Sequence, residues 1–313
     1  MSLTGPHSAS SGAVGLREQA EALSEAMPPL VTEAEHVAST IAQGVHGRRR
    51  TGMGETFWQF RRYREGDTAA SVDWRHSARS THLFVRETER EAAESIWIWR
   101  DSSASMDYAS DFAPCTKRDR ATVIALALSS LLVQGGESVA PLGQGFAAMP
   151  GRSALRRMAH ALIDAPESDA PKTESLPPPE HLPRYSQVVL ISDFLSPAEE
   201  IAERIKRYAA DGIRGHMIQV LDPAEEDLPF SGRTEFEGVE DDLRLMVGRA
   251  QNLREAYHQR LEIHRNRIIE TARRIDFTFA THRTDRSPQT ALLALYGALS
   301  GAIAARKPPR PGM

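Results

Sequence analysis

From Ser95 onward the chain alternates short apolar runs with longer amphipathic stretches, and this order constrains the fold more than any other feature. The apolar runs are SIWIW (95–99), QVVLI (187–191) and HMIQVL (216–221). Runs of this length are typical of strands that are buried on both faces. Helical segments between such strands indicate parallel pairing with crossover helices. The sequence therefore predicts an α/β fold with a mostly parallel sheet and helices on both faces.

The rest of the chain divides by composition into an N-terminal part and further elements of the α/β region. We expect a disordered Ser/Gly-rich N-terminus (1–15), N-terminal helices (16–45) interrupted at Pro28 and Pro29, an arginine- and aromatic-rich β segment (46–94), the α/β domain (95–305) and a short tail (306–313). Within the α/β domain we expect helices at 118–134, 153–163, 197–210, 249–275 and 287–303, a strand pair at 137–142 and 145–149, a hairpin at 234–247 and a strand at 276–281.

Composition excludes several classes of protein. The 313 residues carry a formal net charge of −4, which does not indicate a dedicated nucleic-acid binder. Cys115 is the single cysteine, so an intramolecular disulfide and a cysteine metal cage are impossible, which fits a reducing compartment. No stretch approaches the roughly 20 apolar residues of a membrane span, and the N-terminus lacks the pattern of a signal peptide. We expect a cytoplasmic protein without membrane insertion.

Oxygen-bearing side chains follow two of the predicted core strands and precede one helix. Asp101, Ser103 and Ser105 come directly after the first strand, Asp193 follows the second, and Ser153 precedes the middle helix. Binding sites of such sheets lie at the carboxyl ends of the strands. Hard oxygen donors suit Mg²⁺, Mn²⁺ or Ca²⁺ and do not suit zinc. The five residues are therefore the candidate ligands of one divalent cation, and we predict no catalytic residue.

Two motifs make the chain recognisable. The D-x-S-x-S spacing resembles the metal-ion-dependent adhesion site of von Willebrand factor A domains. The segments FRRYREGD (60–67), SVDWRHSAR (71–79) and LFVRE (83–87) resemble the signature of the domain-of-unknown-function 58 (DUF58) family. The resemblance covers about Gly44 to Ile303. It implies a von Willebrand factor A-like, doubly wound fold on a six-strand plan.

The resemblance also implies a role and a set of residues. Asp101, Ser103 and Ser105 match the first metal loop, and Asp193 matches the third. The second loop lacks the family's Thr, for which Ser153 is the nearest substitute. Arg100 would compete with a metal if it pointed into the site; it would otherwise pair with an acid such as Asp107. The implied function is non-enzymatic: a docking site gated by a divalent cation, in an adaptor between a MoxR-type AAA+ ATPase and a client protein.

Alternative readings remain open at this point. The same residues are also compatible with two other functions. One is a metal-free scaffold with a degenerate site, and the other is a Mg²⁺-dependent phosphohydrolase with Asp101 as nucleophile. The phosphohydrolase lacks a second acid, because Ser103 stands there, and no lysine is expected near the strand ends. Nucleic-acid binding through the arginines at 48–64 is a third class.

The arginine-rich β segment also has a structural interpretation. We expect the interleaved charges to form a brace (Arg61, Arg62, Arg64, Asp67, Asp73, Arg75, Arg79 and Arg86). We expect Tyr63 and Trp74 to be core residues. His76 and Ser77, read as neighbours on a strand, would point to opposite faces and form no catalytic pair. We expect no functional role for Cys115. We expect His258 and His264 of the long helix to be surface residues.

Overall fold

A computed structural model of the protein describes residues 29–45, 56–63, 72–80, 82–89, 95–164, 175–238 and 244–306. Contacts within the chain define two compact units. One unit comprises Met1–Val45 together with Glu94–Met313, and the other is His46–Ala93. Among the described residues, no helix combines the length and apolar character needed to cross a membrane.

The larger unit is built on a five-stranded parallel sheet. Its strands are β3 (Ser95–Arg100), β4 (Ser138–Pro141), β5 (Gln187–Ser192), β6 (Arg214–Leu221) and β9 (Thr278–Arg283). The spatial order is β4-β3-β5-β6-β9, and all neighbours are parallel. The chain therefore starts at an inner strand, β3, adds the edge strand β4 on one side, and then crosses to build the other side with β5, β6 and β9.

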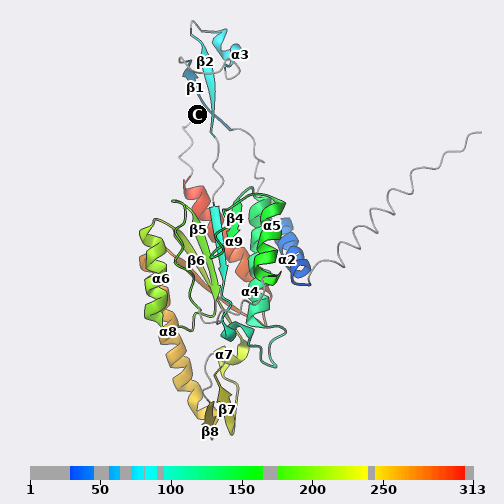
Figure 1. The fold of residues 1–313 in the computed structure, drawn as a ribbon, viewed down its shortest axis with the longest axis vertical. Helices are drawn as coiled ribbons and strands as arrows, with labels where there is room; N and C mark the ends of the chain where they lie inside the picture. The colour runs from blue at the N-terminus through cyan, green and yellow to red at the C-terminus, as the bar shows by residue number, and fades with distance from the viewer. Residues whose placement is uncertain are drawn as a thin grey trace, which may run out of the picture. The chain divides into compact units, whose positions relative to one another are not determined.

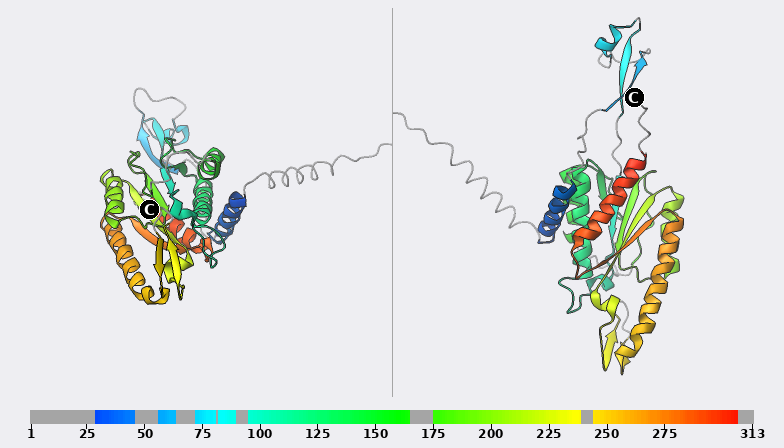
Figure 2. Two further views of the ribbon diagram at one scale, coloured as in Figure 1. Left: turned by 60° about the horizontal axis from the view of Figure 1, so that its bottom comes forward. Right: turned by 180° about the vertical axis from the view of Figure 1, so that it is seen from behind.

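Helices cover both faces of this sheet (Figures 1 and 2). The helical elements of this unit are α2 (Pro29–Val45), η2 (Ala104–Asp107), α4 (Lys117–Gln134), α5 (Arg152–Ala159), the π-turn η3 (His160–Asp164), α6 (Ala198–Ala210), α7 (Pro223–Asp227), η4 (Ala250–Leu253), α8 (Arg254–Arg274) and α9 (Pro288–Arg306). A small hairpin, β7 (Thr234–Glu237) with β8 (Arg244–Val247), precedes α8.

Alternation along the strands separates two cores. On β3, Ile96 and Ile98 belong to the core under α4, α5, α9 and α2, whereas Trp97 and Trp99 belong to the core under α6 and α8. Successive side chains of a strand point to opposite faces, so a strand with helices on both sides must be apolar at every position. This explains the continuous SIWIW run and confirms the predicted α/β sheet.

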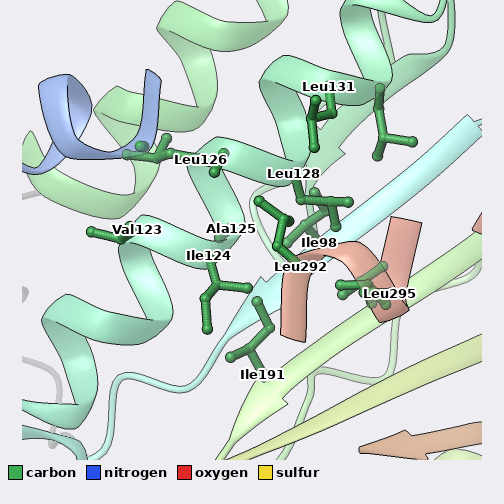
Figure 3. Close-up of a cluster of buried hydrophobic side chains, with 14 of the residues drawn as sticks. Ile98, Val123, Ile124, Ala125, Leu126, Leu128, Leu131, Ile191, Leu292 and Leu295 are labelled. Carbon is green, nitrogen blue, oxygen red and sulfur yellow. The ribbon is translucent and has the colours of Figure 1, made fainter. Parts of the chain in front are cut away.

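The central helix α4 is buried on nearly all sides. It carries little amphipathic character because α2 and α9 pack against it as well as the sheet (Figure 3). Leu128 and Ile124 face Ile98, Ile191 and Leu292 in this core. A helix that is apolar all round requires such enclosure. The N-terminal helix α2 is therefore part of the larger unit, and not a free arm.

Three boundaries differ from the prediction. The sheet has five strands where the resemblance implies six, because the segment predicted at 145–149 forms only one antiparallel bridge, between Met149 and Val139. The helix predicted from Ser153 begins one residue earlier, at Arg152, with Gly151 at its N-cap. The long helix begins at Arg254 after the 3₁₀ turn η4, and not at Arg249.

The smaller unit contains an antiparallel pair, β1 (Thr56–Arg62) with β2 (Phe84–Glu89), and the short helix α3 (Trp74–Ser77). The strands agree with the predicted β segment, but two residues predicted to be in the core are exposed. Trp74 is 63% exposed and Tyr63 38% exposed, so neither is a core residue.

His76 and Ser77 of this unit lie in α3, and not on a strand as predicted. The His76 ring packs edge-on against Phe84, and the Ser77 hydroxyl accepts a hydrogen bond from the Phe84 amide at 2.8 Å. Both residues therefore hold the helix on the strand.

Several predictions fall outside the described residues. They concern the N-terminal segments up to residue 28, the arginines from 48 to 50, Arg64 and Asp67 of the predicted brace, and the tail from residue 307. The side chains of Arg61, Arg62 and Arg86 are also outside the described part, so the arginine brace is not tested.

A buried histidine in the sheet gives the fold a pH dependence. His216 bridges Gln187 and Thr278, at 2.9 Å each, and burial lowers its pKa from 6.5 to about 4. The unfolded chain binds more protons than the folded chain between these values, so stability is full above pH 6.5 and is lost as pH falls toward 4. We expect protonation of His216 to lower the free energy of unfolding by about 3 kcal/mol as the pH falls from 6.5 to about 4.

Denaturant titrations of His216→Asn across this pH range check that expectation. The pH dependence should be shallower than in the wild type, but it should not vanish, since burial also lowers the pKa of His282 to about 4. Equal slopes in the two proteins would contradict the assignment.

Candidate functional site

The order of the strands fixes where a site can form. The chain leaves β3 toward β4 on one side of the sheet and later returns to β5 on the other side. The loops that leave β3 and β5 therefore diverge at the carboxyl ends of these strands, which is the usual site position in open α/β sheets. Asp101 follows β3 directly and Asp193 follows β5 directly. The structure thus brings both predicted acids to the switch point.

Asp101 is buried and fully hydrogen-bonded. Its Oδ1 accepts from the Ser103 amide at 2.8 Å, and its Oδ2 accepts from the Ser192 hydroxyl at 2.6 Å. Burial raises the pKa of Asp101 above its ordinary value, while the Ser192 and Ser103 hydrogen bonds act in the opposite direction. The carboxyl group fixes the loop that carries the two serines.

The remaining predicted ligands of the two loops form a continuous chain of contacts. The Ser103 and Ser105 hydroxyl oxygens lie 3.1 Å apart, and Ser105 donates to Asp193 Oδ2 at 2.7 Å. Two adjacent ligands of an octahedral Mg²⁺ ion, with bonds of about 2.1 Å, lie about 3.0 Å apart. The two hydroxyls therefore have the spacing that neighbouring ligands of such an ion require.

The turn after β5 holds Asp193 rigidly. Phe194 is buried with a φ of 49°, a left-handed conformation that is uncommon for a bulky residue and costs about 1 kcal/mol or more. Gln219 donates to the Asp193 carbonyl at 2.9 Å, and His264 donates to the Phe194 carbonyl at 2.7 Å. His264 therefore has a structural role that the sequence did not predict, since it supports the turn.

A buried lysine enters the site. Lys117, the first residue of α4, is fully buried and donates to Asp193 Oδ2 at 2.9 Å and to Glu225 Oε1 of α7 at 2.5 Å. Burial alone would lower the pKa of Lys117, but Asp193 and Glu225 outweigh it and raise the pKa above its ordinary value. The expectation that no lysine lies near the strand ends was wrong.

Further contacts fasten α7 and the serine loop around this lysine. The Asp222 carboxylate accepts from the Ser110 amide at 2.9 Å and from its hydroxyl at 2.5 Å. Arg118 pairs with Asp107 at 2.6 Å and also donates to the carbonyls of Ser102 and Ser103. The partner predicted for Arg100 is therefore taken by Arg118.

Arg100 itself is half-buried at the end of β3. Burial, together with the charge of Arg118, lowers the pKa of Arg100 to about 10. The charge that contacts the acids of the site is that of Lys117, and not that of Arg100 as the sequence suggested.

Ser153 does not join the other predicted ligands. Met149 pairs antiparallel with Val139 in the first half of β4, so the chain there runs toward the amino edge of the sheet, where α5 begins. Ser153 is exposed, and no hydrogen bond within the described residues connects it to Asp101 or Asp193. No second-loop ligand is therefore supplied from this position.

The cluster combines carboxyl and hydroxyl oxygens, which are the donor type that cations such as Mg²⁺ accept. Asp101 and Asp193 are buried carboxyl groups, Glu225 is a partly buried one, and the Lys117 ammonium group contacts the latter two. No group of three or more His, Cys, Asp or Glu suited to a metal occurs in the described part of the chain. The candidate donors are instead two hydroxyls and two carboxylates.

Three residues of the site were not identified from sequence. Ser192 holds Asp101, while Lys117 and Glu225 lie beside Asp193. Ser192 directly precedes Asp193, so the sequence already placed it at the strand end. Lys117 is one of only four lysines in a chain whose other basic residues are arginine. That rarity was the available signal, but it does not locate the residue.

The architecture defines a class of protein: an open parallel α/β sheet, covered on both faces, with a hydroxyl and carboxylate cluster at its switch point. The family model described as "Protein of unknown function DUF58" matches residues 59–267. This match spans more than half of the chain, and the chain belongs to that family.

Relatives at moderate identity extend the match. The uncharacterized protein Rv1480 of Mycobacterium tuberculosis is 28% identical over 277 residues, covering 84% of this chain and 86% of the relative. The uncharacterized protein Mb1516 of Mycobacterium bovis gives the same values. Their names assign no activity.

Two solved structures are more distant. BatB from Bacteroides thetaiotaomicron is 17% identical with a TM-score of 0.37, covering 68% of this chain and 100% of that chain. An aerotolerance-related membrane protein from Bacteroides fragilis is 18% identical with a TM-score of 0.35, covering 66% and 99%. Likenesses at this level carry no argument about function.

Proposed function

We propose that this protein is a non-enzymatic docking module whose partner binds at the carboxyl edge of the sheet with the help of one divalent cation. The observation that carries the proposal is the cluster of Ser103, Ser105 and Asp193 beside Asp101 at the switch point. The order β4-β3-β5-β6-β9, with the bridge beyond β4, supports a von Willebrand factor A-like, doubly wound fold.

Mg²⁺, Mn²⁺ or Ca²⁺ would be held by the two serine hydroxyls, with Asp193 and Asp101 as supporting carboxylates. The cation would supply an open coordination position for an acidic side chain of a partner. The chain's own part is to fix the serine loop through Asp101 and to orient Ser105 through Asp193. The partner we propose is a MoxR-type AAA+ ATPase, with a client protein whose assembly or maturation the pair assists; this follows from the family resemblance.

A Mg²⁺-dependent phosphohydrolase is the second candidate, and Lys117 is the observation that favours it. A lysine beside acids at a strand end is able to bind a phosphate group. Against it, both oxygens of Asp101 accept hydrogen bonds and the residue is fully buried, so the carboxylate is not presented as a nucleophile. Release of phosphate from a phosphate ester, lost in Asp101→Asn, would favour the enzyme.

The docking proposal is tested by capturing a purified MoxR-type AAA+ ATPase, loaded with ATP, on the immobilised full chain. We expect capture in Mg²⁺ that falls at least tenfold with a chelator or with Asp101→Ala. Asp211→Ala, which replaces the exposed acid at the C-cap of α6, should behave as the wild type. Capture that is equal in Asp101→Ala and wild type, with and without Mg²⁺, would show the docking proposal to be wrong.

A further inference from the structure

We propose that Lys117 sets the cation affinity of this site. Its ammonium group contacts Asp193, and it competes there with any divalent cation that binds. The cation affinity of the free protein is therefore low. This inference rests on the proposed function and adds a residue that neither the motif nor the family resemblance assigns. A site of this kind gains its cation fully only when a partner contributes a further negative charge.

One carboxylate oxygen connects the lysine to a candidate ligand. Asp193 Oδ2 accepts from Lys117 Nζ at 2.9 Å and from Ser105 Oγ at 2.7 Å. The hydroxyl that would coordinate the cation and the fixed ammonium are therefore neighbours on the same atom. Like charges at such separations repel strongly where water is excluded, and Lys117 has no exposed surface.

The ammonium group is held in place from several sides. Its second acceptor, Glu225, is fixed by a capping box in which Glu225 Oε2 accepts from the Asp222 amide at 2.9 Å. The backbone amide of Lys117 donates to the Tyr108 carbonyl at 3.2 Å, and Thr116 caps the helix that begins at Lys117. A lysine with fixed backbone and fixed acceptors does not move aside when a cation approaches.

A purely structural role for Lys117 makes a different prediction. If the lysine only balanced Asp193 and Glu225, its removal would lower stability and leave cation affinity unchanged or reduced. If it competes with the cation, its removal raises affinity, because no ammonium group then balances the charges of Asp193 and Glu225. The sign of the change in affinity separates the two roles.

The experiment is a calorimetric titration of Mg²⁺ into the metal-stripped full chain. We expect Lys117→Met, which keeps the length of the side chain, to bind Mg²⁺ at least tenfold more tightly than the wild type. Lys206→Met, an exposed lysine of α6, is the matched control and should equal the wild type. The gain should disappear in the double variant Asp101→Ala/Lys117→Met.

A second pair of variants protects the test against misfolding. Glu225→Gln removes the other acid that Lys117 contacts. In that background, Lys117→Met leaves only one carboxylate, that of Asp193, without its lysine partner. We expect the double variant Lys117→Met/Glu225→Gln to bind Mg²⁺ more tightly than Glu225→Gln alone. Its melting temperature should also rise more on adding Mg²⁺, because a ligand stabilises the state that binds it.

The outcomes separate this inference from the function on which it rests. Wild-type Mg²⁺ binding that is lost in Asp101→Ala but unchanged or weakened in Lys117→Met overturns the role of Lys117 and leaves the docking site standing. Absence of binding in the wild type and in both Lys117→Met backgrounds overturns the cation site and the inference with it.

Discussion

Asp193→Ala is expected to destabilise the protein by about 3–5 kcal/mol, which is the usual cost of breaking a buried ion pair from one side. The substitution leaves the Lys117 ammonium buried with one carboxylate, Glu225, and removes the acceptor of Ser105. The Leu195 amide also loses its acceptor, Asp193 Oδ1 at 3.2 Å, so the turn that holds Phe194 in its left-handed conformation loses support. Denaturant titration at neutral pH measures the loss.

The matched control is an exposed acid in a pair of similar length. Glu203 of α6 lies 2.6 Å from Arg207, and both side chains are more than half exposed. Exposed pairs of this kind contribute about 0.3–0.5 kcal/mol. Glu203→Ala should therefore change the free energy of unfolding very little. A loss for Asp193→Ala no larger than that of Glu203→Ala would contradict the buried ion pair, and with it the position assigned to Lys117.

Gly215→Ala is expected to cost about 3 kcal/mol or more, for a reason unrelated to charge. Gly215 lies in β6, and a Cβ atom there would stand 1.9 Å from a ring carbon of Phe277, a buried residue of the core under α6 and α8. Neither the central strand nor the buried ring can shift freely, so the added methyl group forces strain into a close-packed core. The midpoint of thermal or denaturant unfolding reports the effect.

Gly297→Ala provides the opposite expectation. Gly297 lies in α9 with open space around the position of a Cβ atom, so alanine should stabilise the helix by about 0.5–1 kcal/mol. Replacing Phe277 by leucine in the Gly215→Ala background should restore part of the loss. Equal stabilities of Gly215→Ala and wild type would show that the ring does not pack on this glycine.

The sequence by itself determined the order of the elements and the position of the serine loop. A strand buried on both faces must be apolar at every position, so SIWIW and QVVLI identify core strands without any knowledge of their neighbours. Asp101 and Asp193 directly follow these strands. Parallel strands end at one edge, so the two acids were expected to meet, and they do.

Sequence patterns misplaced residues whose environment depends on the packing of a short element. Trp74 was expected in a core because it is large and aromatic, but α3 is a single turn on a two-stranded sheet and leaves the side chain exposed. Ser153 was expected at the site as the nearest substitute for the threonine of the second metal loop. The return of the chain along β4 places that helix start at the amino edge.

Only the tertiary structure decided which charge lies inside the candidate site. Lys117 is separated from Asp193 by 76 positions and from Glu225 by 108, and no local periodicity connects them. The start of α4, the turn after β5 and the helix after β6 converge because three strands end at the same edge of the sheet. Local sequence sets which side chains stand at strand ends, whereas the strand order and the crossing of the chain set which of them meet, since long-range contacts follow from topology and not from spacing.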